Sequence, residues 1–274
     1  MDFVLSLSFA QKYGEDQVTQ LIDLERLAQK SAILQVGKSL TFDIIGLRIL
    51  SIMKECLKNI KHKYGREITK SAMNPPKDDE QTFRLFQEAH TFGVFNFESD
   101  EMRRYLKILQ PSTFEELIAL NTMYRPRIID CIDGYTKRKR GLEAITYDHP
   151  MMEKYLKETY GVIIYQEQIM LLSQEIANFT PEESDLFARA ICHQRPNQSK
   201  PALKEKFIRG GMENGYTEEF LEKIWRDWMR CGNYLFNKSH AVCYTWLAYK
   251  MAYLKAHYPE EFMHAYFTVN DKAI

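Results

Sequence analysis

The 274-residue sequence has only five cysteines, an odd number, and no two of them form a C-x-x-C pair. A disulfide-stapled fold uses cysteines in even numbers at short spacings. The cysteine content therefore excludes a disulfide scaffold and indicates a reducing compartment. The cysteines are Cys56, Cys131, Cys192, Cys231 and Cys243.

The sequence also lacks a long hydrophobic run, since no stretch approaches the roughly 18 apolar residues that span a membrane. The first residues, MDFVLSLSFAQKYGED, contain a short apolar run. No basic segment precedes this run, and charged residues follow it too soon for a signal peptide. We therefore expect a cytoplasmic protein with no membrane partner.

A net charge is absent as well, because 37 Lys and Arg residues balance 37 Asp and Glu residues. Attraction to nucleic acid must then come from a local cluster rather than from the whole molecule. With 45% hydrophobic and 27% charged residues, the composition is typical of a soluble globular protein with a buried core. The length suits one large domain or two small ones.

Most of the chain has the three- and four-residue hydrophobic spacing of helices, as at Val18, Leu21, Leu24 and Ala28. The exception is LTFDIIGLRIL, 40–50, a short run rich in Ile, Leu and Phe. Such a run predicts a buried strand that turns into a helix. The partial alternation in HTFGVFNFES, 90–99, is compatible with a further extended segment.

Several local signals predict where helices and domains begin. Thr180 precedes Pro181 and stands three residues before Glu183, which is typical of a helix start. Pro75 and Pro76 mark the best linker candidate. We predict a mainly α protein with a small strand-bearing region at residues 1–60 and a helical domain at residues 61–274.

Two groups of residues are candidate metal ligands. Asp43 lies inside an apolar run, where a carboxylate must be paired, hydrogen-bonded or bound to metal. It either caps a turn near Gly46 or binds a metal, and a two-metal site would need further carboxylates. His240, Cys243 and Cys231 could be considered for zinc, but their spacing fits no standard zinc site.

The stretch LFARAICHQRPNQSKPALKEKFIRGG, 186–211, has six basic residues and one acidic residue, Glu205, which gives a local excess of +5. Such a cluster attracts phosphates with strong salt dependence. The alternative is a solvated helix face without a ligand. The basic residues are Arg189, Arg195, Lys200, Lys204, Lys206 and Arg209.

The segment GNYLFNKSHAVCYTW, 232–246, places a polar cluster at the start of a long apolar segment that we predict to be helical. Unpaired N–H groups and the positive dipole end at a helix N-terminus favour an anion, and Lys238 and His240 would add donors there. Tyr234 offers a flat face for a base or sugar. The alternative is that Ser239 merely caps the helix.

Taken in order, four longer segments resemble the fingers region of the bacterial DNA polymerase III alpha subunit, the C-family of replicative polymerases. The segment LTFDIIGLRILSI resembles the palm strand of that family. The resemblance runs almost continuously from residue 40 to 267, and EKYLKETYGVIIYQEQIMLLS is most similar to the Bacteroidetes type. The four segments are FGVFNFESDEMRRYLKILQPSTFEELIALNTMYRP, YLKETYGVIIYQEQIMLLS, FIRGGMENG and YLFNKSHAVCYTWLAYKMAYLKAHYPEEFM.

The resemblance implies a role for each candidate residue. Tyr234 and His240 would stack on and hydrogen-bond an incoming dNTP, and Lys238 would lie near its phosphates. Asp43 would be the third catalytic aspartate and a Mg²⁺ ligand. The basic residues Arg189, Arg195, Lys204 and Lys206 would contact DNA or the triphosphate. The implied partners are a DNA primer–template, dNTP and replisome subunits, and the implied domains are a palm and thumb remnant at 1–60 followed by fingers.

The sequence departs from the family pattern at the catalytic positions. The paired aspartates, D-x-D-F, should precede the KYGED segment, where only Met1-Asp2-Phe3 stands. The thumb and part of the palm have no counterpart between Leu40 and Thr41. The family run A-M-G-K-K-K is AICHQRP here, and R-P-G-P is RPRI.

These departures affect catalysis more than folding, because one aspartate cannot hold the two metal ions that three would hold. We therefore predict a protein similar to the DNA polymerase III alpha subunit whose nucleotidyl transfer is impaired. The alternatives are a non-catalytic module that binds DNA, a nucleotide or a replisome partner, and a decayed gene product.

Overall fold

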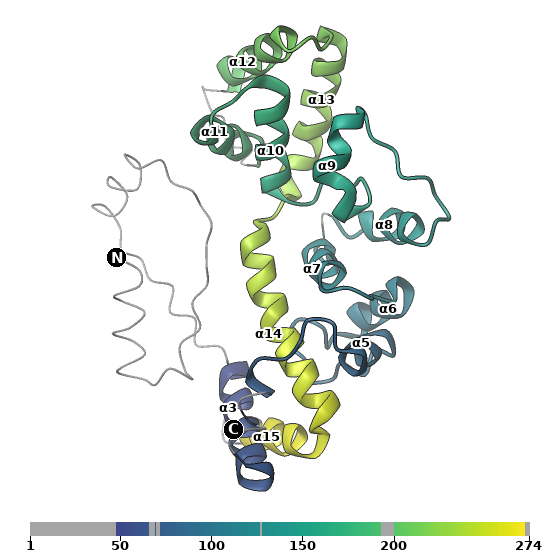
Figure 1. The fold of residues 1–274 in the computed structure, drawn as a ribbon, viewed down its shortest axis with the longest axis vertical. Coiled ribbons are helices and arrows are strands. Elements are labelled where there is room, and N and C mark those ends of the chain that lie inside the picture. The colour runs from purple at the N-terminus through teal and green to yellow at the C-terminus, as the bar shows by residue number, and fades with distance from the viewer. Residues whose placement is uncertain (1–47, 66–68, 70–71, 127, 193–199, 272–274) are drawn as a thin grey trace, which may run out of the picture. The chain divides into compact units, whose positions relative to one another are not determined.

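The computed structural model describes residues 48–65, 69, 72–126, 128–192 and 200–271, and every regular element in these ranges is a helix (Figure 1). This confirms the predicted mainly α class. Within these ranges, strand-type pairing is limited to an isolated parallel bridge between Tyr165 and Phe236. The strand predicted around Asp43, and the palm remnant with it, lies outside the described residues.

The chain divides into two compact units. One contains the described residues up to 117 and from 242 onward, and the other contains the described residues of 118–241. The domain boundary predicted at residue 60 lies inside the helix α3. None of the helices in the described part of the chain is long and apolar enough to cross a membrane.

The helices follow one another along the chain. In order they are α3 (Arg48–Tyr64), α5 (Glu80–Gln87), α6 (Asp100–Leu109), α7 (Phe114–Met123), α8 (Cys131–Lys139), η2 (Pro150–Met152), α9 (Glu153–Leu156), η3 (Lys157–Thr159), α10 (Gln166–Ala177), α11 (Pro181–Cys192), α12 (Lys200–Glu213), α13 (Glu218–Cys231), η4 (Gly232–Tyr234), α14 (Lys238–His257) and α15 (Pro259–Asp271).

The unit that contains both α3 and α15 is held together by their packing. Ile52, Cys56 and Ile60 stand four residues apart on one face of α3, and all three are buried. The Lys63 ammonium at the end of α3 lies 2.6 Å from the carboxylate of Glu261 on α15. The four-residue spacing thus positions an apolar stripe, and an ion pair closes its end.

Residues 90–99 do not form an extended segment. The Val94 N–H donates to the Thr91 carbonyl at 2.9 Å and the Phe97 N–H donates to the Val94 carbonyl at 3.0 Å, so the backbone makes two successive turns. The Thr91 hydroxyl donates to the Phe97 carbonyl at 2.5 Å and closes the loop. Val94 and Phe97 are fully buried. These two residues, three positions apart, therefore point inward from successive turns and do not belong to a strand.

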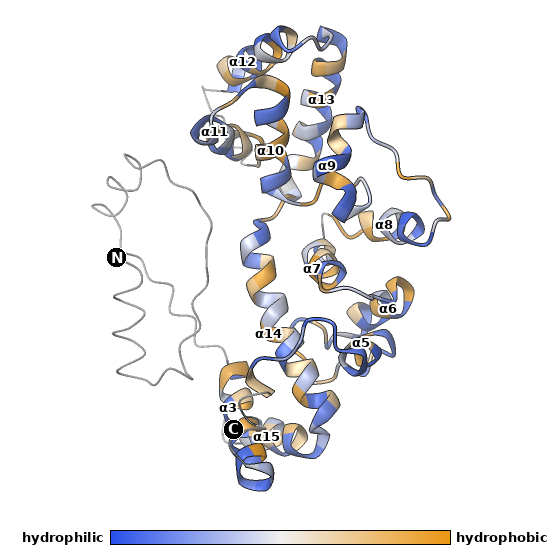
Figure 2. Ribbon diagram, viewed as in Figure 1, coloured by the Kyte–Doolittle hydropathy of each residue, from blue (hydrophilic) through white to orange (hydrophobic). Residues whose placement is uncertain are grey.

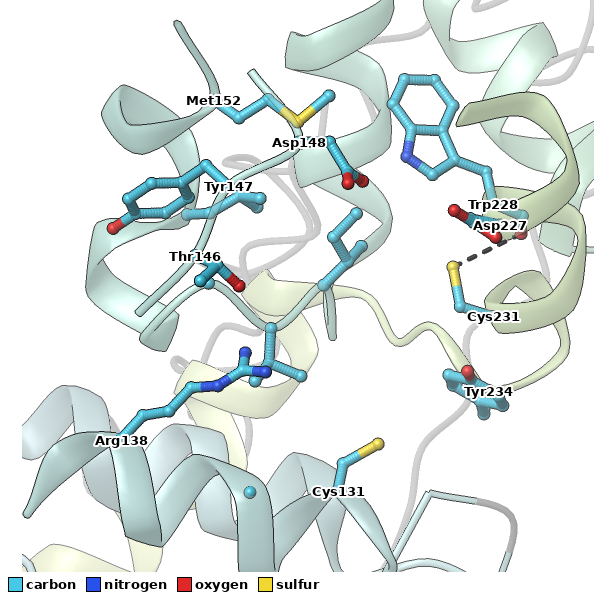
Figure 3. Close-up of a pocket in the computed structure, with 15 residues that line it drawn as sticks. Cys131, Arg138, Thr146, Tyr147, Asp148, Met152, Asp227, Trp228, Cys231 and Tyr234 are labelled. Carbon is cyan, nitrogen blue, oxygen red and sulfur yellow. Dashed lines mark hydrogen bonds between the residues drawn. The ribbon is translucent and has the colours of Figure 1, made fainter. Parts of the chain in front are cut away.

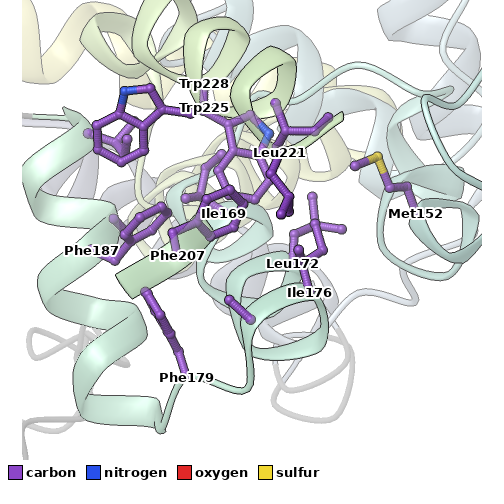
Figure 4. Packing of buried hydrophobic residues seen from close by; sticks show 14 of the residues in the cluster. Met152, Ile169, Leu172, Ile176, Phe179, Phe187, Phe207, Leu221, Trp225 and Trp228 are labelled. Atoms are coloured by element: carbon purple, nitrogen blue, oxygen red, sulfur yellow. The ribbon is translucent and has the colours of Figure 1, made fainter. Parts of the chain in front are cut away.

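The second unit is built on α10 to α13, whose helices each carry hydrophobic and hydrophilic residues (Figure 2). Phe187, Phe207 and Trp228 form an aromatic centre, with ring centroids 5.2, 6.0 and 5.4 Å apart. Figure 4 shows this centre among aliphatic side chains of the neighbouring helices. The buried cluster comprises Met152, Leu156, Ile169, Leu172, Ile176, Ala177, Phe179, Phe187, Ala188, Ile191, Phe207, Leu221, Ile224, Trp225, Trp228 and Leu235.

The predicted start of α11 is confirmed. The Glu183 N–H donates to the Thr180 hydroxyl at 3.2 Å, and the Thr180 N–H donates to the Glu183 carboxylate at 3.1 Å. This reciprocal pair satisfies two backbone donors that a helix start leaves unpaired. It also fixes the orientation of α11, which contributes Phe187 to the core.

Candidate nucleotide-binding site

The predicted nucleotide-binding segment runs from η4 into the first turn of α14, and the start of α10 lies directly beside it. The Phe236 N–H donates to the Ile164 carbonyl at 3.1 Å, and the Gln166 N–H donates to the Phe236 carbonyl at 3.0 Å. These two bonds form the bridge between Tyr165 and Phe236. They place the first residues of α10 next to the N-terminus of α14.

Asn237 caps α14. Its side-chain oxygen accepts the His240 N–H at 2.8 Å, which is the contact expected of a helix N-cap. The interpretation that Ser239 caps this helix is therefore wrong, since Ser239 lies inside the first turn and is buried. The polar run therefore contains the cap, Asn237, followed by Lys238 and His240, whose side chains are partly or fully exposed.

An acidic side chain already occupies the amides of this helix start. The carboxylate oxygens of Glu167 accept the Lys238 N–H at 2.9 and 3.0 Å. Burial raises the pKa of the Glu167 carboxyl, while backbone hydrogen bonds from Lys238 and Ser239 act in the opposite direction. The anion expected at this N-terminus is thus supplied by the protein itself.

The Lys238 ammonium faces a second glutamate. Its Nζ atom lies 2.7 Å from the Glu158 carboxylate and 5.3 Å from the centroid of the Tyr165 ring. The Lys238 and Glu158 side chains are 34% and 40% exposed, so a ligand can reach the pair from solvent. Neither Glu158 nor Glu167 is among the residues that the sequence predicts for the site.

His240 is exposed and borders an aromatic–cation stack. Its ring meets the Phe236 ring edge-on, at a centroid distance of 5.2 Å. The Arg125 guanidinium lies 3.3 Å from the centroid of the same Phe236 ring. Burial lowers the pKa of Arg125. Arg125 is a cation that the sequence does not single out for the site.

Tyr234 lies one turn before α14 and lines a cavity rather than the α14 N-terminus (Figure 3). Burial, together with the nearby thiols of Cys231 and Cys131, raises the pKa of Tyr234 to about 12. The phenol therefore stays protonated and can donate a hydrogen bond. Lys238 and His240 share the first turn of α14, while Tyr234 is presented from η4.

Residues 49–215 match the family described as the bacterial DNA polymerase III alpha subunit finger domain. The chain belongs to this family. It is 42% identical over 225 residues to DNA polymerase III subunit alpha of Aquifex aeolicus (strain VF5), a match that covers 81% of this chain and 19% of that protein. The corresponding subunit of Halalkalibacterium halodurans is 42% identical over 220 residues, which cover 80% of this chain and 19% of the relative.

The subunit of Thermus aquaticus is 39% identical over 235 residues, covering 84% of this chain and 19% of that protein. The finger-domain chain therefore spans about a fifth of the length of the curated relatives that it matches.

The basic stretch of this finger domain is compensated by acidic partners. Arg189 pairs with Asp185 at 3.1 Å within α11, and Lys204 of α12 lies 2.8 Å from Glu222 of α13. The Lys206 ammonium contacts the carboxylate of Glu183, which is also part of the α11 start. Arg195 lies outside the described residues. The local excess of charge in the sequence is thus neutralised at these three cations.

The described part of the finger domain contains no group of three or more His, Cys, Asp or Glu side chains that could hold a metal ion. His240, Cys243 and Cys231 do not form such a group, so the zinc interpretation finds no support. Asp43 lies outside the described residues. The described side chains therefore do not supply a Mg²⁺ site.

Proposed function

We propose that this chain forms the part of a DNA polymerase III alpha-type enzyme that holds the incoming dNTP against a primer–template. In that role it takes part in template-directed transfer of a nucleotide to a primer 3′-hydroxyl, with release of pyrophosphate, in the cytoplasm. The observation that supports this most is the finger-domain match over residues 49–215. The partners that the role requires are DNA, dNTP and other replisome subunits.

In the proposed complex the triphosphate binds Lys238 and His240 contacts the base or sugar, whereas Tyr234 faces the separate cavity beside α8. Lys238 must then exchange the Glu158 carboxylate for a phosphate oxygen. An exposed ion pair contributes only about 0.2–1 kcal/mol. A triphosphate carries several negative charges against one on Glu158, so the exchange favours the triphosphate.

We further propose that the 274-residue chain does not transfer nucleotides by itself. Two-metal catalysis needs several carboxylates around the ions. The sequence contains no D-x-D-F motif, and the resemblance assigns only Asp43 to the metal. Binding and chemistry are therefore separate properties of this polypeptide and can be measured separately.

Two assays test the two parts. In primer extension with Mg²⁺, the purified chain is expected to add no nucleotide above background. In calorimetric titration, dNTP is expected to bind about 10-fold or more weakly to Lys238→Met, because a charged contact is lost. Lys54→Met removes an exposed lysine of α3 and serves as the matched control. Incorporation that Asp43→Ala abolishes would contradict the inactive chain, and equal dNTP affinity in both variants would contradict the role of Lys238.

A second candidate function is a non-catalytic module that binds DNA. The observation that favours it is the partial exposure of Lys204 and Lys206 in the basic stretch, whose side chains are 36% and 41% exposed. It predicts salt-sensitive DNA binding that survives Asp43→Ala and weakens when Lys204 and Lys206 are neutralised. Absence of DNA binding at low salt would rule this candidate out.

A further inference from the structure

The unit built on α10 to α13 contains a cavity of about 430 Å³, which is within the usual range of small-molecule sites (Figure 3). One wall is a face of α8 and another is the end of α13 with Tyr234. The segments 146–148 and 161–163 and the apolar side chains of Met152 and Leu156 complete it.

The wall formed by α8 is kept open by a glycine. Cys131, Gly134 and Arg138 line the cavity at steps of three and four residues, which places them on one helical face. Glycine inside a helix is unfavourable compared with alanine. A Cβ atom added at Gly134 would meet no atom within 4 Å, so close packing does not explain this glycine. Because Gly134 has no side chain, this part of the cavity stays unfilled.

The cavity carries opposite charges at its two sides. Arg138 extends into it from α8, and Asp148 and Asp227 lie on the other side (Figure 3). The Arg138 Nε donates to Glu143 at 2.9 Å, and one Nη atom reaches the Tyr160 carbonyl at 3.4 Å, so the guanidinium has further donors for an oxyanion. Asp148 and Asp227 lie 2.5 and 3.1 Å from the Lys223 ammonium.

The side chains between these two ends are uncharged. Burial raises the pKa of the Cys131 thiol and raises the pKa of the Cys231 thiol to about 12. The Tyr234 hydroxyl is likewise protonated, and the Tyr234 ring offers an aromatic face at the cavity wall. A ligand that fits has an oxyanion at one end, a flat ring in the middle, and N–H or O–H donors at the other end.

We propose that this cavity binds a nucleoside monophosphate moiety, with its phosphate at Arg138 and its sugar or base donors toward Asp148 and Asp227. The proposal deepens the proposed function, on which it rests for the nucleotide class, and it assigns the nucleotide contact of Tyr234 to this cavity. It does not require Lys238 or His240 to touch the same group.

The test uses the full chain and dAMP as the probe in calorimetric titration. Gly134→Leu fills the cavity from a helix face that has room for it, so we expect at least about a 10-fold loss of dAMP affinity. The melting temperature of this variant should be equal to that of the wild type or higher, because a good helix former replaces glycine. A folding defect would lower both dAMP affinity and the melting temperature, so a loss of affinity alone identifies the cavity as the binding site.

A second pair of variants tests the charge. Arg138→Met should weaken dAMP about 10-fold or more, whereas Lys137→Met, which removes the preceding exposed cation, should leave dAMP affinity unchanged. Adenosine and inorganic phosphate, titrated alone, should each bind more weakly than dAMP.

Failure to bind dAMP at millimolar concentration, or binding that neither Gly134→Leu nor Arg138→Met weakens, would overturn the cavity proposal. Lys238→Met separates the two sites. If Lys238→Met weakens dNTP binding while dAMP binding still depends on Gly134 and Arg138, both proposals stand. If it changes neither ligand, only the Lys238 contact fails.

Discussion

At the residue scale, the Glu167 carboxylate stabilises the start of α14, but its burial disfavours its charged form. The carboxylate accepts the Lys238 N–H and so satisfies a donor that the helix leaves unpaired. Burial disfavours the charged form more than the hydrogen bonds favour it, since the pKa of the carboxyl is raised. The folded protein therefore binds a proton at Glu167 more readily than the unfolded chain does.

This difference gives a pH-dependent stability with a definite sign. Because the folded pKa of Glu167 lies above the usual 4.5, its contribution to stability is present at or below 4.5 and is lost as pH rises through the raised value. Glu167→Gln has no such titration. As the pH is lowered from about 7 to about 5, the unfolding free energy of the wild type should therefore rise relative to that of Glu167→Gln.

Urea unfolding of both proteins at several pH values measures this difference, and the exposed Glu182→Gln provides the control. A wild-type-minus-variant difference that stays constant, or that falls on acidification, would contradict the prediction. The comparison of the wild type with Glu167→Gln cancels the titration of the other carboxylates, because both proteins contain them.

Residue-level prediction from sequence succeeds where the physical cause is local. Thr180 and Glu183 stand three residues apart, so their reciprocal bond is visible in the sequence as a motif. The contact between Glu167 and Lys238 joins residues 71 positions apart, and the Lys238–Glu158 contact joins residues 80 apart. No spacing rule predicts such pairs. The sequence therefore predicts a bound anion at the start of α14, where the structure has the carboxylate of Glu167.

At the element scale, two helical glycines serve opposite purposes. A Cβ at Gly210 of α12 would collide with the carbonyl oxygen of Ala177, at the end of α10. The glycine there permits close contact between two helices. Gly134 of α8 faces open space instead. The same residue type therefore marks packing in one helix and a vacant volume in the other.

Alanine at these two positions should change stability in opposite directions. Gly210→Ala pushes α12 away from a backbone atom and is expected to destabilise the protein by about 1–3 kcal/mol. Gly134→Ala is expected to stabilise it by about 0.5–1 kcal/mol, because alanine restricts the unfolded chain and suits a helix. Denaturant unfolding measures both, and a loss of stability in Gly134→Ala would show that α8 packs more tightly there than the structure indicates.

Element prediction fails where periodicity is ambiguous. Residues 90–99 carry aromatics at near-alternate positions, which suits both a strand and a compact loop whose side chains turn inward. The hydrogen bonds of Thr91, Val94 and Phe97 select the loop. The helices are easier to predict, because three- and four-residue spacing over many turns has few alternative explanations.

At the scale of the whole molecule, zero net charge is accompanied by local compensation. The basic stretch has a sequence excess of +5, yet Lys204 and Lys206 face Glu222 of α13 and Glu183 of α11, which lie outside that stretch on the two adjacent helices. A charge count along the chain cannot detect this, because folding brings the partners together. In the proposed DNA-binding role, DNA must therefore compete with internal carboxylates for these lysines.

That competition predicts an increase in DNA affinity when a carboxylate is removed. Glu222→Gln leaves the Lys204 ammonium without its charged partner at 2.8 Å and should tighten binding to a primer–template. One more phosphate contact should also steepen the dependence of log affinity on log salt by about 1. Lys204→Met should do the reverse and make the slope shallower.

Fluorescence anisotropy over a salt series measures both quantities, with the exposed Glu218→Gln of α13 as the control for a change in net charge alone. If Glu222→Gln and Glu218→Gln raise affinity equally, the effect comes from overall charge. In that case the pairing of Lys204 with Glu222 would not govern DNA binding. A greater gain in Glu222→Gln, reversed by adding Lys204→Met, would show that the released lysine itself contacts a phosphate.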